Sequence, residues 1–225
     1  MEKSKISLPV LVMALMAMLL VPLTSYAGSN DELRQYVVDN THVLMSKLET
    51  NKTVYHTDPD KFYQVMEESL GNFVDFRRIA ARVMGRYARQ ATPEQRHAFL
   101  EKFKHSLFDS YAKALVDAKD YQINVKDVIP NPRDDSRAQV NLEVVSGSGN
   151  RYPITYSMYR NDQGKWVLEN IIVEGVNIGL AFRDRFEQDM EKQRGNVQAV
   201  IDNWSGAVKQ LDEKHPSQGS ATGQS

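Results

Sequence analysis

The residues best placed to do chemistry in this sequence are arginines that recur along one predicted helix. The segment 77–113 contains nine lysines and arginines against three aspartates and glutamates, and Arg78, Arg82 and Arg86 follow one another at intervals of four residues. Residues spaced by four lie on the same face of an α-helix, with Arg89 nearby. Such a face is either an ordinary solvated surface or a docking surface for an acidic partner or for lipid phosphates. We expect these four arginines to face outward and to dock the protein on its partners.

Catalytic and metal-binding patterns are missing from the sequence. It has no Gly-x-Ser-x-Gly, no His-Glu-x-x-His and no glycine-rich phosphate loop; the glycines of the segment 146–149 fall between two predicted strands and indicate a flexible hairpin. His97 and His105 share one predicted helix, but eight residues separate them by about 12 Å, too far to share a metal ion. Asp134 and Asp135 lie in a predicted turn, where hydration by solvent is enough to account for two adjacent carboxylates. We therefore expect no catalytic residue, no metal and no cofactor.

The N-terminus has the features of a secretory signal peptide. Two lysines within residues 1–5 precede an almost wholly apolar stretch, and Ser25-Tyr26-Ala27 forms a small-x-small cleavage site. We expect cleavage near Ala27 and export. We expect one domain over residues 28–211 and a disordered tail, rich in Gly, Ser, Pro and Gln, over residues 212–225.

Composition narrows the class of protein further. The 225 residues carry 28 basic and 29 acidic side chains, and this balance, together with export, argues against a general nucleic-acid binder. No apolar run long enough to cross a bilayer follows the signal peptide. The chain has no cysteine, which excludes disulfides, thiolate metal sites and a lipid-modified N-terminal cysteine. Its stability must therefore come from its core.

Helical periodicity and capping signals dominate the first half and the end of the chain. Asp58, Asp75 and Asn177 each precede an apolar stripe of helical spacing, as N-cap residues do. The run Thr92-Pro93-Glu94-Gln95 combines a cap, a proline in the first turn and a capping box. We expect helices over residues 31–48, 59–70, 76–87, 93–118, 178–190 and 197–211.

Between residues 121 and 174 the apolar period changes to two, which is typical of strands with one wet face. Turn residues separate the alternating runs, so the strands are expected to form an antiparallel meander. The last run, 166–174, has apolar residues at both even- and odd-numbered positions. This pattern indicates a central or bulged strand that ends at Gly175. The other expected strands cover residues 121–125, 138–144 and 152–158.

The order of elements, helices, then a meander, then helices, is typical of an α+β fold. The helices must cover the apolar face of the sheet. A single twisted sheet wrapped by helices is a common way to make a deep apolar cavity, so the architecture itself suggests one.

Several motifs are specific in combination. They are Asn72-Phe73-Val74-Asp75-Phe76-Arg77-Arg78-Ile79-Ala80, Val83-Met84-Gly85-Arg86-Tyr87, Ala91-Thr92-Pro93-Glu94-Gln95 with Phe99 and Phe103, Trp166-Val167, and Val173-Glu174-Gly175-Val176 with Arg183 and Phe186. Together they resemble the MlaC, or toluene-tolerance, family over most of residues 31–211. The chain departs from the family pattern at Ala88, where an aromatic residue is common, and at Asn177, where serine is usual. Both departures concern the shape of the pocket.

The resemblance implies an NTF2-like fold, in which helices wrap a curved antiparallel sheet and enclose an apolar lipid pocket. It implies a periplasmic phospholipid carrier of the Mla lipid-asymmetry pathway. Such a carrier shuttles lipid between an outer-membrane lipoprotein–porin complex and an inner-membrane ABC transporter that carries an MCE-domain ring. The cargo is a phospholipid, and the resemblance implies no chemistry on it.

We expect the pocket to lie between the sheet and the two central helices. Two alternatives remain open: an enzyme on the same fold acting on a small apolar substrate, and an adaptor that carries no lipid. An enzyme is expected to place a perturbed Asp, His or Tyr deep in the cavity. The expected lipid-binding residues are Phe76, Ile79, Val83, Phe103, Leu107, Tyr111, Val140, Leu142, Tyr156, Met158, Trp166, Ile171 and Val173.

Overall fold

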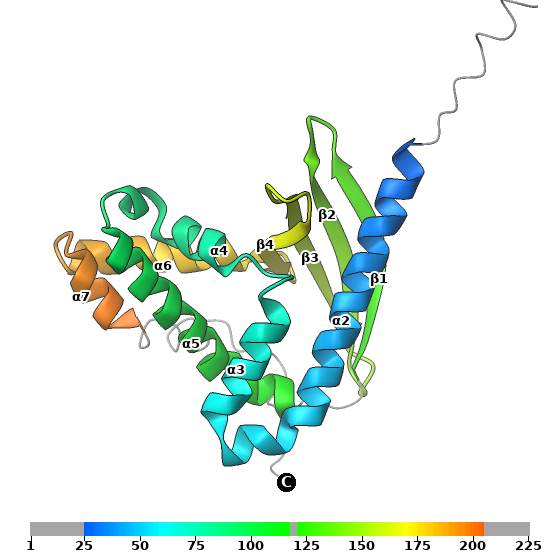
Figure 1. Ribbon diagram of the computed structural model, residues 1–225, viewed down its shortest axis with the longest axis horizontal. Helices are drawn as coiled ribbons and strands as arrows, with labels where there is room; N and C mark the ends of the chain where they lie inside the picture. The colour runs from blue at the N-terminus through cyan, green and yellow to red at the C-terminus, as the bar shows by residue number, and fades with distance from the viewer. Residues whose placement is uncertain (1–24, 118–120, 205–225) are drawn as a thin grey trace, which may run out of the picture.

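The computed structural model of the protein describes residues 25–117 and 121–204 (Figure 1). Helices precede and follow one antiparallel sheet, which confirms the predicted α+β order. Residues 1–24 of the predicted signal peptide, and the whole predicted tail, lie outside the described residues. The elements are α2 (Ser25–Thr57), α3 (Pro59–Leu70), α4 (Phe76–Met84), the 3₁₀ helix η2 (Gly85–Arg89), α5 (Pro93–Asp117), β1 (Gln122–Asn131), β2 (Asp134–Val145), β3 (Arg151–Arg160), β4 (Trp166–Val173), β5 (Val176–Asn177), α6 (Ile178–Lys192) and α7 (Val197–Asp202).

Capping side chains fix the starts of four helices. Asp58, Asp75 and Asn177 each accept a hydrogen bond from the backbone N–H three residues further on. Thr92 and Gln95 form the predicted capping box, in which each side chain accepts a bond from the other residue's backbone N–H. These bonds satisfy donors that the first helical turn leaves unpaired, so the helices begin where the sequence predicts.

The third predicted helix ends earlier than its sequence periodicity indicates. α4 stops at Met84, and Gly85 takes φ +56°, a conformation that glycine adopts without the penalty a side chain would bring. The short helix η2 follows directly. Because of this break, the arginine face predicted from four-residue spacing ends at Arg82.

The sheet is an antiparallel meander in the order β1-β2-β3-β4-β5, as predicted. After Gly175 the chain turns back, so the very short β5 pairs with the end of β4. The segment before α4 pairs in parallel with β4: the Leu168 N–H donates to the Phe73 carbonyl at 2.8 Å, and the Asp75 N–H donates to the Leu168 carbonyl at 3.0 Å. The start of α4 is therefore fastened to β4.

β4 contains a bulge. Consecutive residues of β3 lie opposite Leu168 and Asn170, so Glu169 between them has no partner in the ladder. An extra residue reverses the parity of the strand beyond it. Even-numbered residues before the bulge and odd-numbered residues after it therefore share a face, which explains the apolar run on both parities. The prediction of a central or bulged strand is confirmed.

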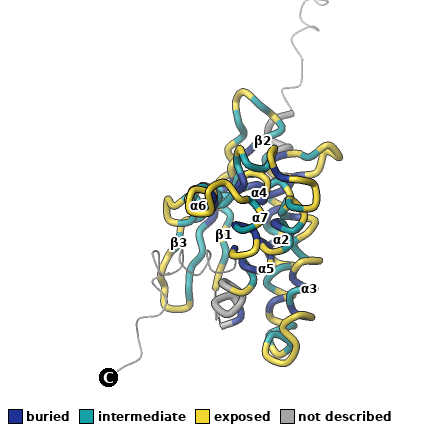
Figure 2. The backbone as a smooth tube through the Cα atoms, turned by 90° about the vertical axis from the view of Figure 1, so that its left-hand side faces the viewer, coloured by how far each residue is buried: buried dark blue, intermediate teal, exposed yellow. Residues whose placement is uncertain are grey.

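Buried apolar side chains form three separate clusters. A helical cluster joins α4, α5, α6 and α7, a sheet cluster joins the sheet to α2 and the segment before α4, and a third joins α2, α3 and α5. Along α2 and α3, buried positions alternate with exposed ones (Figure 2). Within the described residues, no helix combines the length and hydrophobicity needed to cross a membrane.

Candidate functional site

One face of the sheet is apolar across its four long strands, and we call it the apolar face. Strand pairing aligns its side chains in rows that run across the sheet. Seven of the predicted lipid-binding residues share this face: Val140, Leu142, Tyr156, Met158, Trp166, Ile171 and Val173. Other members of this face include Ile123, Val125, Val128, Ala138, Val144, Tyr152, Ile154 and Leu168.

Only part of the apolar face is covered. Leu33 and Val37 of α2, with Phe73, pack against its buried members. Toward the other end of the strands the coverage decreases, and Ile154 and Ile171 are only half-buried. Half-buried apolar side chains in neighbouring rows leave a continuous surface with an affinity for apolar groups.

Tyr156 lies in the middle of the apolar face. Its ring centroid is 6.0 Å from that of Phe73, in an edge-to-face arrangement. Burial raises the pKa of its phenol to about 12, because the charged form would lose its water. The indole N–H of Trp166, buried on the same face, has no hydrogen-bond partner in the structure. Tyr156 thus carries a polar group among apolar side chains, whereas the Trp166 ring also lies under the Arg160 guanidinium, 4.8 Å from its centroid.

The predicted residues on the helices do not join the sheet residues. Val83 and Phe103 are fully buried in the helical cluster, and Ile79 and Leu107 pack against it. In this structure Val83 and Phe103 pack with α6 and α7 and not with the sheet residues, so their part in lipid binding stays a prediction. Phe76 is half-buried and belongs to none of the three clusters. The side chain of Tyr111 lies outside the described part of the structure.

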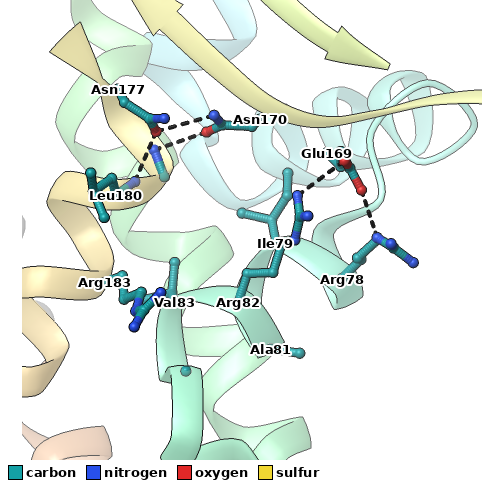
Figure 3. Close-up of a pocket in the computed structure, with 12 residues that line it drawn as sticks. Arg78, Ile79, Ala81, Arg82, Val83, Glu169, Asn170, Asn177, Leu180 and Arg183 are labelled. Atoms are coloured by element: carbon teal, nitrogen blue, oxygen red, sulfur yellow. Dashed lines mark hydrogen bonds and ion pairs between the residues drawn. The ribbon is translucent and has the colours of Figure 1, made fainter. Parts of the chain in front are cut away.

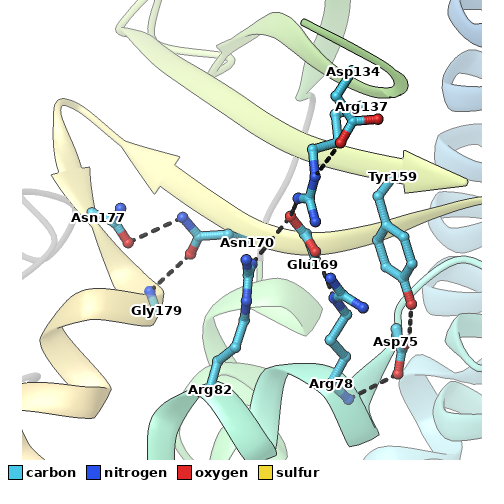
Figure 4. Close-up of polar contacts among 10 residues, drawn as sticks. All are labelled: Asp75, Arg78, Arg82, Asp134, Arg137, Tyr159, Glu169, Asn170, Asn177 and Gly179. Atoms are coloured by element: carbon cyan, nitrogen blue, oxygen red, sulfur yellow. Dashed lines mark hydrogen bonds and ion pairs between the residues drawn. The ribbon is translucent and has the colours of Figure 1, made fainter. Parts of the chain in front are cut away.

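On the opposite face of the sheet, a buried carboxylate gathers three guanidinium groups (Figure 4). The Glu169 side chain is only 4% exposed, and it accepts a bond from Arg78 Nε at 2.7 Å. Arg82 Nη1 lies 3.1 Å from the same carboxylate, and Arg137 of β2 donates to it as well. Because Leu168 before it belongs to the apolar face, strand alternation directs Glu169 to this side, where it meets cations. The buried charge is thereby compensated.

A second contact fastens α4 to the sheet beside this carboxylate. The Arg78 guanidinium lies over the Tyr159 ring, 4.1 Å from its centroid. The Tyr159 hydroxyl donates to the Asp75 carboxylate, which also caps α4. Burial and the neighbouring Asp75 raise the pKa of Tyr159. α4 is thus held to β3 and β4 by polar contacts.

The four predicted docking arginines do not form one outward face, and that prediction is corrected. Arg78 and Arg82 turn toward Glu169. Arg86 lies on η2, where its guanidinium contacts the Tyr87 ring and donates to the Tyr87 hydroxyl. Of the original stripe, Arg86 and Arg89 are the exposed members that do not contact Glu169. The positive φ at the end of α4 is the physical reason that the stripe divides.

An open cleft of about 580 Å³ lies beside Glu169, between α4, β4 and the start of α6 (Figure 3). Of the predicted lipid-binding residues, it is lined only by Ile79 and Val83. Its lining residues are Arg78, Ile79, Ala81, Arg82, Val83, Gly85, Glu169, Asn170, Asn177, Gly179, Leu180 and Arg183.

Sequence reasoning missed the polar residues of this region. Glu169 is the only charged residue in the eight residues of β4, and a lone charge in an apolar strand was the available signal. Arg183 was named only as part of a family motif, and Arg137 carried no signal, because its role depends on tertiary contacts. Among the described residues, no group of three or more His, Cys, Asp or Glu side chains is arranged to hold a metal ion.

Comparison with known proteins gives matches in sequence and in structure. The family model of the MlaC protein matches residues 39–206. The toluene tolerance protein ttg2D of Pseudomonas putida is 37% identical over 185 residues, which cover 80% of this chain and 84% of that protein. The intermembrane phospholipid transport system binding protein MlaC of Haemophilus influenzae is 22% identical over 137 residues, covering 60% of this chain and 64% of that one.

A solved structure with a similar fold is that of a phospholipid-binding protein from Ralstonia solanacearum in complex with a phospholipid. It superposes with a TM-score of 0.69 at 22% sequence identity, covering 79% of this chain and 97% of that one. This likeness supports the α+β fold. The match to the family model over most of the described residues, with the ttg2D identity, shows that this chain belongs to the MlaC family of phospholipid-binding proteins.

Proposed function

We propose that the protein is a periplasmic phospholipid carrier that holds acyl chains against the apolar face of its sheet. The observation that carries the proposal is that the face is continuous across four strands and only partly covered, although its members are apolar. Globular domains usually bury their apolar residues in one contiguous core. Here the helical cluster and the sheet cluster stay separate.

The related proteins support the same proposal. The Haemophilus influenzae relative is a binding protein of an intermembrane phospholipid transport system, and the Ralstonia solanacearum structure contains a phospholipid. By extension, this chain shuttles phospholipid between an outer-membrane lipoprotein–porin complex and an inner-membrane ABC transporter with an MCE-domain ring. The signal peptide expected at its N-terminus takes it to the periplasm.

The physics of transfer sets the design of such a carrier. Each buried CH₂ contributes about 0.8 kcal/mol, so an acyl chain of about 16 carbons contributes roughly 13 kcal/mol relative to water. In a bilayer the chains are already dry, so the carrier must cover them almost completely to compete. The charged headgroup stays near water, because burying an unpaired charge costs several kcal/mol. The carrier needs no bond-making chemistry, cofactor or metal for this task.

Docking to the partner complexes is assigned to the arginines that remain exposed. Arg86 and Arg89 are proposed to steer the carrier toward acidic surfaces, as separated surface charges do. Replacing both by glutamate is expected to slow transfer to membrane complexes in vitro and to leave lipid loading unchanged. Arg133, exposed in the β1–β2 turn, and Arg194, exposed after α6, provide the matched control. Transfer that slows equally in the Arg133→Glu/Arg194→Glu variant would assign the effect to net charge alone.

The experiment that tests the carrier proposal uses two neighbouring positions on β1. Val128 packs against the sheet cluster, whereas Ile129 points to the opposite face and is 49% exposed. Val128→Trp fills space on the apolar face and is expected to reduce phospholipid that co-purifies in the absence of detergent by about tenfold, the cost of displacing one or two methylene groups.

Ile129→Trp is the control, since it adds the same side chain to the same strand. Its co-purified phospholipid should match the wild type, as measured by solvent extraction and phosphorus analysis. Equal lipid content in the two variants, with both folded by circular dichroism, would refute the assignment of the apolar face. Wild-type protein that contains no phospholipid would refute the carrier proposal itself.

A further inference from the structure

The cleft between α4, β4 and α6 is lined by charged side chains, which a site for acyl chains does not need. Among its lining residues are three arginines and one acidic residue. Arg82 comes from α4 and Arg183 from α6, so two separate helices bring guanidinium groups to it (Figure 3). A concentration of cations around an open cleft favours a negatively charged ligand.

Two of these arginines are only lightly engaged by protein groups. Within the described part of the chain, Arg82 makes a single ion pair, with Glu169 at 3.1 Å, and its side chain is 49% exposed. Arg183 contacts Glu187 at 3.5 Å, at the limit of a hydrogen bond, and is 50% exposed. A guanidinium group has five N–H donors, so both retain donors for a ligand.

Glu169 sets the position of the arginines and does not cancel their charge. Its carboxylate is shared by Arg78, Arg82 and Arg137, and it is almost fully buried. Nearby carboxylates engage the outer arginines: Asp134 pairs with Arg137, and Glu187 with Arg183. With these pairs counted, four guanidinium groups stand against the carboxylates of Asp134, Glu169 and Glu187, so one net positive charge remains around the cleft.

Two glycines keep the walls of the cleft close to its polar groups. A Cβ at Gly85, where φ is +56°, would lie 3.4 Å from Arg183 Nε. A Cβ at Gly179 would lie 2.4 Å from Asn170 Oδ1, which accepts the Gly179 N–H. A side chain at Gly179 would displace Asn170 from the wall of the cleft, whereas at Gly85 the contact is ordinary and the positive φ is what disfavours a side chain.

We propose that this cleft binds a phosphate group, held between the guanidinium groups of Arg82 and Arg183. Arginine presents a planar fork of donors that matches phosphate oxygens, and a tetrahedral phosphate accepts bonds from two forks in different directions. The half-buried Ile79 and the 49% exposed Leu180 offer apolar contacts beside it. The phosphate belongs either to the headgroup of a carried phospholipid, in which case the inference rests on the proposed function, or to a free phosphate.

The test uses delipidated full-length protein and the double variant Arg82→Gln/Arg183→Gln, with Arg133→Gln as the control. Inorganic phosphate is titrated while the arginine side-chain N–H signals are followed by NMR. We expect saturable shifts in the wild type and the control, and affinity lower by about ten- to a hundredfold in the double variant, the effect of losing charge-assisted hydrogen bonds.

A second experiment distinguishes a lipid headgroup from free phosphate as the ligand, and the phosphate site from the carrier proposal. Dioleoylphosphatidylglycerol and dioleoylglycerol share their acyl chains, and only the first carries phosphate. If loading of the phospholipid falls in the double variant and loading of dioleoylglycerol does not, the cleft holds the lipid headgroup. If only the inorganic phosphate titration changes, the ligand is a free phosphate. If neither arm differs between the double variant and the wild type, the phosphate site is refuted, whereas failure of both lipids to load on wild-type protein refutes the carrier proposal alone.

Discussion

The helical cluster and the apolar face are built from similar kinds of residue but are closed to different extents. In the helical cluster, Phe99, Phe186 and Trp204 are fully buried, and their ring centroids lie 4.9–5.8 Å apart. On the apolar face, coverage decreases from the buried Val140 to the half-buried Ile171. One region has completed its packing within the chain, and the other has left part of its contact surface open.

This difference indicates that apolar side chains in this fold serve two separate tasks. A closed aromatic cluster stabilises the chain, because each ring gains both burial and contacts. A half-open sheet face contributes less stability per residue and retains an affinity for other apolar groups. If this separation is correct, substitutions in the two regions must affect different measurements.

The largest effect on stability is expected in the helical cluster. Phe186→Ala removes a fully buried ring from the helical cluster and should lower the free energy of unfolding by about 3–5 kcal/mol, measured by urea denaturation. The remaining folded protein should contain phospholipid in the wild-type ratio. Lipid lost in proportion to folded protein would mean that the helical cluster lines the cargo site after all.

The second-largest effect on stability is expected at Glu169, whose carboxylate holds α4 to the sheet. Glu169→Gln leaves three guanidinium groups without their shared carboxylate, and half-exposed Arg78 and Arg82 recover part of their hydration. We expect the free energy of unfolding to fall by about 1–3 kcal/mol, within the range for groups that lose a charged partner. Glu143→Gln, which removes a carboxylate paired with the largely exposed Arg151 and Lys126, should cost less than about 1 kcal/mol. Equal costs for the two variants would contradict the structural importance of the buried cluster.

A smaller effect is expected for stability on the apolar face, together with a clear effect on cargo. Ile154→Ala removes a half-buried side chain, so the free energy of unfolding should fall by about 1 kcal/mol, below the usual cost in a closed core. Co-purified phospholipid should fall by several-fold. A cost in stability as large as that of Phe186→Ala would show that the face is as tightly packed as the helical cluster.

The smallest expected effect concerns pH. Burial raises the pKa of Tyr156 from 10.0 to about 12, so between these values the unfolded phenol loses its proton while the folded one keeps it. The contribution to stability is complete below pH 10 and is lost as the pH rises toward 12. Tyr156→Phe removes this contribution, so its unfolding free energy should fall less steeply from pH 10 to 12 than that of the wild type. Identical slopes would place Tyr156 in contact with water.

Much of the fold could be predicted from the sequence because its signals are local. The caps at Asp58, Asp75, Thr92 and Asn177 act within four residues, and strand alternation reports directly which side chains share a face. Alternation accounts in this way for Val140, Leu142, Tyr156 and Met158. Trp166 shares their face with Ile171 and Val173 only because the bulge reverses the parity of β4. The early end of α4 was missed, because helical periodicity continues past Gly85 although its backbone does not.

The candidate site depends on contacts between distant parts of the chain, and these have no local signal. Arg78 and Arg137 are 59 residues apart in the sequence, yet both contact Glu169. Periodicity assigned Arg78 and Arg82 to water, because it cannot show that α4 packs beside β4, where Glu169 meets them. It also could not show that the apolar residues of the helices and of the sheet form separate clusters.

Photo-crosslinking can test directly whether acyl chains lie against the apolar face of the sheet. The protein is loaded with a phospholipid that carries a photoactivatable diazirine near the end of one acyl chain, irradiated, digested and analysed by mass spectrometry. We expect labels on half-buried members of the apolar face, such as Val128, Ile154 and Ile171. Labels concentrated on helical-cluster residues such as Phe99 or Phe186, or on Ile129 of the opposite face, would contradict it.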